Sequence, residues 1–166
     1  MSLPVYPLMQ IVEVKQRRVE EAEKVVREKQ SVLDKENEKL AQREAERDQV
    51  KNHYLDKLKQ LRTTLDSETT STEIQQMKVY IKIVDEKLKV EEKKVKDQKD
   101  QVTAAEKAVQ TAKDHLKAKR QEVDKILGHK KEWEKEARRE LTIIEAREQD
   151  ELGSIIFMSK HKEKIF

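Results

Sequence analysis

The sequence predicts an all-α fold: a long antiparallel two-helix coiled-coil hairpin with a C-terminal helical overhang. Three observations support this fold class. Charged residues make up 43% of the 166 residues, apolar residues recur every three to four positions, and there are only 2 Gly and 2 Pro. Regular apolar spacing in such a composition is typical of long helices and coiled coils.

The first helix is expected over about residues 8–66. One heptad position along it is almost entirely apolar and holds Val12, Val19, Val26, Leu33, Leu40, Arg47, Tyr54 and Leu61. Apolar residues that repeat every 3.5 positions on average keep one face of a helix against a partner helix. We call this face the seam.

A bend is expected at about residues 66–70, because seven of the ten residues from Thr63 to Thr72 are Ser or Thr. Hydroxyl side chains compete with the backbone for hydrogen bonds and therefore favour turns and helix caps. Thr70 precedes Glu73 by three positions, which is the spacing of a capping box at a helix start.

The second helix is expected over about residues 71–151, with Gly153 ending it and a tail over 152–166. Two heptad positions form its seam face. The first holds Ile74, Ile81, Leu88, Val95, Val102, Val109, Leu116, Val123, Lys130, Ala137 and Ile144; the second holds Met77, Val84, Glu91, Gln98, Ala105, Ala112, Lys119, Ile126 and Trp133. The whole chain, 1–166, is expected to form a single elongated domain.

A bend near residue 68 sets the register, with facing residues whose numbers sum to about 135. Leu33 then faces Val102. A slip by one heptad would match nearly as well, and the composition of the turn selects between the two. The same rule places Gln98 beside Asn37, where two amides either fix the register or simply contact water. Glu91 comes within reach of Arg43 or Arg47.

Several function classes are disfavoured. Residues 1–66 carry 14 basic and 13 acidic side chains, so no basic patch favours nucleic acid or an anionic membrane surface. The longest apolar run, Ile155–Met158, is far too short to span a bilayer. The chain has no Cys, which fits a reducing compartment. We expect a soluble protein that does not insert into a membrane.

No catalytic, cofactor-binding or metal-binding residue is predicted. The two glycines, Gly128 and Gly153, lie too far apart for a phosphate-binding loop. The four histidines show no metal-ligand spacing, and a two-helix hairpin offers no concave pocket. Enzymatic activity is not expected, so function is sought on surfaces and ends.

At the bend end, Val79, Ile83 and Val90 recur at helical spacing on the back of the second helix, with Tyr80 alongside. A row of apolar residues on a surface suggests a binding partner. The alternatives are a third helix or a second copy of the chain packed on the same face.

At the open end, Trp133 and the apolar patch of Ile155, Ile156 and Phe157 are candidates for a second partner. Trp133 either binds a partner or continues the seam beneath the N-terminal "LPVYP". The patch either docks into a socket or folds back on the overhang.

The N-terminal "YPLMQIVEVKQRRVEEAEKVV" resembles the opening of the YscO family of type III secretion proteins. That family begins with a Tyr-Pro-Leu-like entry, followed by spaced basic residues and then an Ala-Glu pair. In this sequence the matching residues are Tyr6 to Leu8, then Lys15 and Arg18, then Ala22 and Glu23. "ERDQVKNHY" and "KVYIKIVDEKL" add to the similarity, as do the length and the single central bend.

The resemblance implies a cytoplasmic, non-catalytic coiled coil, similar to the flagellar protein FliJ and to the stalks of rotary ATPases. Such a protein would be a monomeric stalk without a cofactor, peripheral to the secretion apparatus at the inner membrane. Its implied partners are the secretion ATPase hexamer, the export-gate protein, secretion chaperones and the needle-length regulator. By the stalk analogy the open end enters the ATPase ring and the bend end meets the gate. The alternative is a structural spacer or dimeric scaffold with no ATPase partner.

Overall fold

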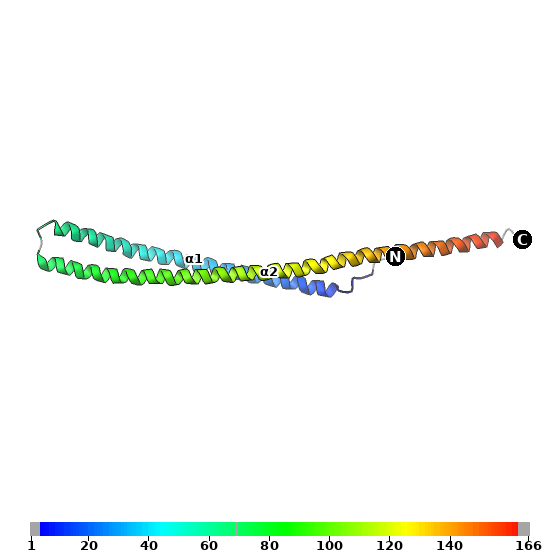
Figure 1. Cartoon of the computed structure of the whole chain (residues 1–166), viewed down its shortest axis with the longest axis horizontal. Helices are drawn as coiled ribbons and strands as arrows, with labels where there is room; N and C mark the ends of the chain where they lie inside the picture. Colours follow the sequence, from blue (N-terminus) through cyan, green and yellow to red (C-terminus); the bar gives the residue numbers. More distant parts are fainter. Residues whose placement is uncertain (1–3, 69, 163–166) are drawn as a thin grey trace. The chain divides into compact units, whose positions relative to one another are not determined.

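The computed structural model describes residues 4–68 and 70–162, and the side chains of 4–68 and 70–159. Two helices make up this part of the chain, α1 (Met9–Leu65) and α2 (Ser71–Lys162). Figure 1 shows α1 from blue to green and α2 from green to red. No strand occurs among the described residues, and the predicted all-α class is confirmed.

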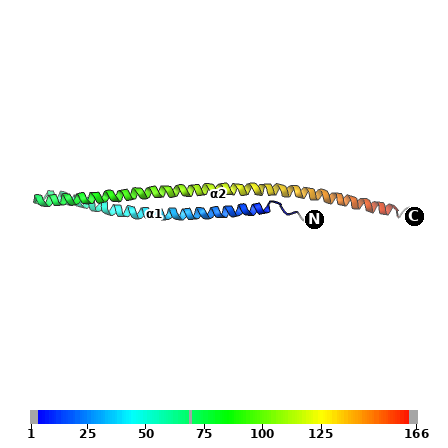
Figure 2. The same ribbon diagram turned by 90° about the horizontal axis from the view of Figure 1, so that it is seen from below.

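Contacts divide the chain into two units. Unit 1 consists of Met1–Ala22 and His115–Phe166, and unit 2 consists of Glu23–Asp114. Within each unit α1 and α2 lie side by side and run in opposite directions, as the view in Figure 2 also shows. The predicted antiparallel helical hairpin is therefore confirmed.

The seam follows the predicted heptads. Every stripe residue from Val12 to Ala137 is buried or half-buried. The buried apolar residues are Tyr6, Val12, Ala22 and Ala137 in unit 1, and Val84, Leu88, Val95, Val102, Val109 and Ala112 in unit 2. Burial of one such valine or leucine stabilises the fold by about 1.5–3 kcal/mol. Each unit is thus held together by its seam.

Hydroxyl groups near the bend donate to backbone carbonyls of the last turns of α1, and one of these, that of Thr64, is among the four that the helix end leaves unpaired. The Thr64 hydroxyl donates to the carbonyl of Gln60 at 2.8 Å, and the Ser67 hydroxyl donates to the carbonyl of Thr64 at 2.9 Å. Thr70 precedes α2, and its carbonyl accepts the amide hydrogen of Ile74 at 3.3 Å. The chain reverses where the Ser/Thr cluster predicts; Thr69 lies outside the described residues.

The prediction that Gly153 ends the second helix is wrong, because α2 continues to Lys162. A glycine stops a helix by adopting a left-handed conformation, and no described glycine has a positive φ. No atom lies within 4 Å of the position that a Cβ of Gly153 would take. A solvent-facing glycine costs a helix only about 1 kcal/mol relative to alanine, so a single glycine need not end it. The last four residues, 163–166, lie outside the described part.

Candidate functional site

An exposed apolar row lies near the start of α2. Val79, Ile83 and Val90 expose 62%, 47% and 54% of their surfaces, while Val84 between them is buried in the seam. We call these three residues the bend-end row. Exposed apolar side chains gathered on one helix face are the usual mark of a protein interaction surface.

Tyr80, predicted to belong to the same surface, is also held by α1. Its hydroxyl lies 3.0 Å from Nε2 of His53, and the two rings meet edge-on. The ammonium of Lys57 lies 5.5 Å from the centre of the Tyr80 ring, within reach of a cation–π contact. Tyr80 is still 45% exposed, so it forms the border between the bend-end row and α1.

A groove of about 400 Å³ is lined by Tyr80 together with Lys57, Met77 and Ile81. Met77 and Ile81 belong to the seam but are only half-buried here, whereas Val84, one turn further along α2, is buried. The seam is therefore less tightly filled toward the bend. Neither His53 nor Lys57 was predicted; applying the register rule to Tyr80 would have found them.

At the open end, in unit 1, the N-terminal segment covers Trp133. Tyr6 is 4% exposed, its ring meets the Trp133 indole edge-on at 5.4 Å, and its hydroxyl lies 2.6 Å from Nδ1 of His129. Trp133 is half-buried as a result. The structure thus gives Trp133 a packing role at the seam, and only part of the indole is left for a partner.

The C-terminal patch lies on α2 itself. Ile155, Ile156 and Phe157 expose 64%, 54% and 71% of their surfaces. These exposures and the continuous helix contradict the interpretation in which the patch folds back on the overhang. Whether the patch binds a partner stays a prediction.

Gln98 does contact the opposite helix, but the partner is not Asn37. Its amide donates to the carboxylate of Glu36 at 2.6 Å and to the Glu36 carbonyl at 3.0 Å, and Asn37 is exposed. Successive residues of a helix point about 100° apart, so Asn37 turns away while Glu36 faces the seam. Hydrogen bonds from Lys39 and then Gln98 lower the pKa of Glu36.

The expected contact between Glu91 and an arginine is also absent. One Glu91 oxygen accepts a hydrogen bond from Lys94 at 2.7 Å, and its Oε2 is buried without a hydrogen-bond partner. Arg47 instead donates to the adjacent Asp48 at 2.8 Å, and Arg43 to Glu46. Local pairs along one helix take these long side chains, because they need less ordering than a pair across the seam.

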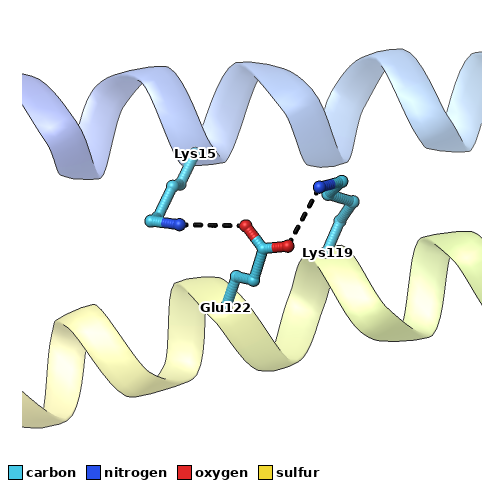
Figure 3. Close-up of polar contacts among 3 residues, drawn as sticks. All are labelled: Lys15, Lys119 and Glu122. Atoms are coloured by element: carbon cyan, nitrogen blue, oxygen red, sulfur yellow. Dashed lines mark hydrogen bonds and ion pairs between the residues drawn. The ribbon is translucent and has the colours of Figure 1, made fainter.

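A three-residue ionic cluster joins the helices of unit 1 (Figure 3). The ammonium of Lys15 on α1 lies 2.9 Å from one Glu122 oxygen, and that of Lys119 lies 2.9 Å from the other. The two hydrogen bonds, first that from Lys15, lower the pKa of Glu122 to about 2. The sequence analysis did not predict this cluster. The register rule places Glu122 within two positions of the residue opposite Lys15, so a search for opposite charges near each facing position could have found the pair.

In residues 4–68 and 70–162, no group of three or more His, Cys, Asp or Glu side chains is placed to hold a metal ion. Neither described helix has a stretch long and apolar enough to cross a membrane.

The fold and these surfaces define a class of protein: a helical hairpin with exposed apolar faces. A model of the family described as YscO-like protein matches residues 3–163. The chain therefore belongs to the YscO-like family of type III secretion proteins, as its N-terminal pattern indicated.

A solved structure agrees with this assignment, and a second one matches part of the chain. CT670 from Chlamydia trachomatis, described as a candidate YscO homologue, is 48% identical over 97% of this chain and 99% of its own, with a TM-score of 0.90. A chain in the structure of the Chlamydia pneumoniae CdsV and CdsO protein complex is 51% identical over 51% of this chain and 98% of its own, with a TM-score of 0.49. A search of curated protein sequences gave no match.

Proposed function

We propose that this protein is a non-catalytic, cytoplasmic component of a type III secretion system. In this proposal it is a stalk-like coiled coil, peripheral to the apparatus at the inner membrane, that links the secretion ATPase hexamer to the export gate. It also handles secretion chaperones and the needle-length regulator. The observation that carries the proposal is the YscO-like family match over residues 3–163.

The distribution of exposed apolar residues supports two separate binding surfaces. The bend-end row lies in unit 2, and the C-terminal patch lies in unit 1. The residues of both surfaces are exposed, so binding there does not require the hairpin to open. We assign the bend-end row to the export-gate protein and the open end to the ATPase ring, following the stalk analogy.

The ATPase assignment is tested by titrating the purified chain into the purified secretion ATPase and measuring nucleotide hydrolysis. The chain alone is expected to hydrolyse no nucleotide, and to raise the turnover of the ATPase when the two are mixed. An unrelated coiled coil of similar length and charge serves as the control. A rate that stays constant across the whole titration contradicts the stalk role.

The exposed bend-end row also favours a second candidate, a dimeric scaffold in which two copies of the chain pair through Val79, Ile83 and Val90. Light scattering over a range of concentrations separates the two functions. The stalk is expected to remain a monomer at every concentration, whereas the scaffold gives a stable dimer that Val79→Asp dissociates.

A further inference from the structure

The seam face of α2 continues beyond the residues that cover it in unit 1. Tyr6 packs on this face at Trp133, and Ala137 is still only 8% exposed. Leu141, one turn on, is half-buried, and the next stripe residue, Ile144, is 44% exposed. We call residues 138–159 of α2 the overhang.

Beyond Ala137 the seven-residue spacing of the seam gives way to an eleven-residue spacing. Leu141 and Leu152 lie eleven residues apart, and so do Ile144 and Ile155. Eleven residues are close to three full turns of a helix, so these four side chains share one face, in line with Trp133 and Ala137. We call these four residues the overhang stripe. In a coiled coil such a stripe receives the side chains of a second helix. The stripe therefore continues an interface that is made a few turns earlier, and a helix is the occupant that fits it.

Two carboxylates define the charge of this face. Glu148 occupies a stripe position between Ile144 and Leu152, and Glu151 lies beside it one turn further on. Both are exposed. Arg138 and Arg147 lie farther round the helix from the centre of the stripe. A helix that covers the stripe would therefore be favoured by Lys or Arg opposite these two glutamates.

A second copy of the chain is a poor occupant for the same reason. In an antiparallel pair centred on Glu148, Ile144 would meet Leu152 of the other copy, but Glu148 would meet its own counterpart. A parallel pair in register also places the two Glu148 side chains together. Two like charges brought into one partly desolvated layer oppose pairing.

We propose that the overhang docks an amphipathic helix of another protein, one that carries apolar residues at coiled-coil spacing and Lys or Arg opposite Glu148 and Glu151. This inference goes beyond the proposed function, because it concerns the chemistry of the docked helix and holds whichever protein supplies it.

The test uses the full chain and two fluorescent synthetic peptides of about three heptads, both with Leu and Ile at the core positions. The basic peptide has Lys at its flanking positions, and the acidic peptide has Glu there. Fluorescence anisotropy is expected to show binding of the basic peptide at least about tenfold tighter than that of the acidic peptide. Equal affinities would overturn the proposal.

Matched variants locate the binding. Ile144→Asp is expected to weaken binding of the basic peptide by about tenfold or more, because it places a carboxylate in the apolar layer. Ile143→Asp is the control, since Ile143 is 52% exposed but lies off the stripe, and binding should be unchanged. Equal weakening by both variants contradicts docking on this stripe. Both residues are exposed, so circular dichroism should show unchanged helicity.

Charge reversal separates specific docking from non-specific binding to an apolar surface, because only specific docking should change its preference between the two peptides. The double variant Glu148→Lys, Glu151→Lys is expected to prefer the acidic peptide over the basic one. An unchanged preference would overturn the proposal. A concentration-dependent dimer of the wild-type chain that Ile144→Asp dissociates would also overturn it, in favour of a second copy as the occupant.

Discussion

Glu122 has a strongly lowered pKa because it lies between two lysines. Lys15 and Lys119 each donate to one of its oxygens, and the pKa of Glu122 is lowered to about 2. The three side chains remain partly exposed, with 26%, 24% and 37% of the surfaces of Lys15, Lys119 and Glu122 accessible. Solvent screening therefore keeps the cluster's contribution modest.

The first prediction concerns the pH dependence of stability. The pKa of Glu122 in the folded protein lies below its ordinary value of 4.5, so the stabilisation is fully present above that pH and is lost as the pH falls toward about 2. Over this window the free energy of unfolding should fall more steeply for the wild type than for Glu122→Gln. Urea unfolding followed by circular dichroism measures both. Parallel pH profiles would show that the cluster is not formed in solution.

The second prediction concerns Tyr6, whose buried ring covers Trp133. Tyr6→Ala should destabilise unit 1 by about 3 kcal/mol, because it removes a large buried side chain. Tyr6→Phe keeps the ring and removes the bond to His129, and should cost about 1 kcal/mol. Urea unfolding monitored through the fluorescence of Trp133, the chain's only tryptophan, measures both. An unchanged emission and midpoint in Tyr6→Ala would mean that the N-terminal segment does not cover Trp133.

At the scale of the helices, the sequence was sufficient to predict the two helices, the position of the bend and the approximate register between them. Heptad spacing is a geometric property of the helix, so the predicted stripe residues could be assigned to the seam without coordinates. The end of α2 could not be assigned in this way. A glycine ends a helix when it adopts the left-handed conformation, with a positive φ. The amino-acid sequence alone does not show which φ Gly153 adopts.

Polar partners were the least predictable part of the helices. Gln98 donates a hydrogen bond to Glu36, although the register rule pointed to Asn37, the next residue along the helix. The rule is accurate only to one or two positions, so it cannot distinguish two adjacent residues. Arg47 was assigned to Glu91 across the seam, but an adjacent Asp48 competes for it. Register constrains apolar layers well because they tolerate small shifts, whereas hydrogen bonds do not.

The third prediction tests the register in unit 2. Spin labels on Leu33 and Val102 should lie closer together than labels on Leu33 and Val95 or on Leu33 and Val109, which report a slip of one heptad in either direction. Pulsed electron paramagnetic resonance measures all three pairs. A short distance between singly labelled Leu33 residues of two chains would instead indicate a parallel dimer and contradict the hairpin.

For the whole molecule, the sequence was enough to predict the exposure of the bend-end row but not the partial burial of Trp133. The bend-end row could be found because residues off the seam of a long helix have no core to enter, and their exposure agrees with that expectation. Trp133 was less predictable, because its cover comes from an N-terminal segment that precedes α1 and follows no heptad. Segments without periodicity carry no register from which a contact can be derived.

The fourth prediction tests the central claim, that the bend-end row is a partner surface on a hairpin that is stable without it. The double variant Val79→Asp, Ile83→Asp should lose binding to the export-gate protein, because carboxylates would have to be desolvated in the interface. Its helicity, melting temperature and stimulation of the ATPase should match the wild type. Val25→Asp, Val32→Asp is the matched control: these residues of α1 are 42% and 49% exposed in the same unit, and gate binding should survive their change.

Gate binding of the Val79→Asp, Ile83→Asp variant, measured by calorimetry alongside its thermal melt, is the most direct single measurement. The account predicts lost binding with an unchanged melt. Binding equal to that of the wild type, or a melt that falls well below it, would contradict the account, the latter because the row would then be part of the protein's own core.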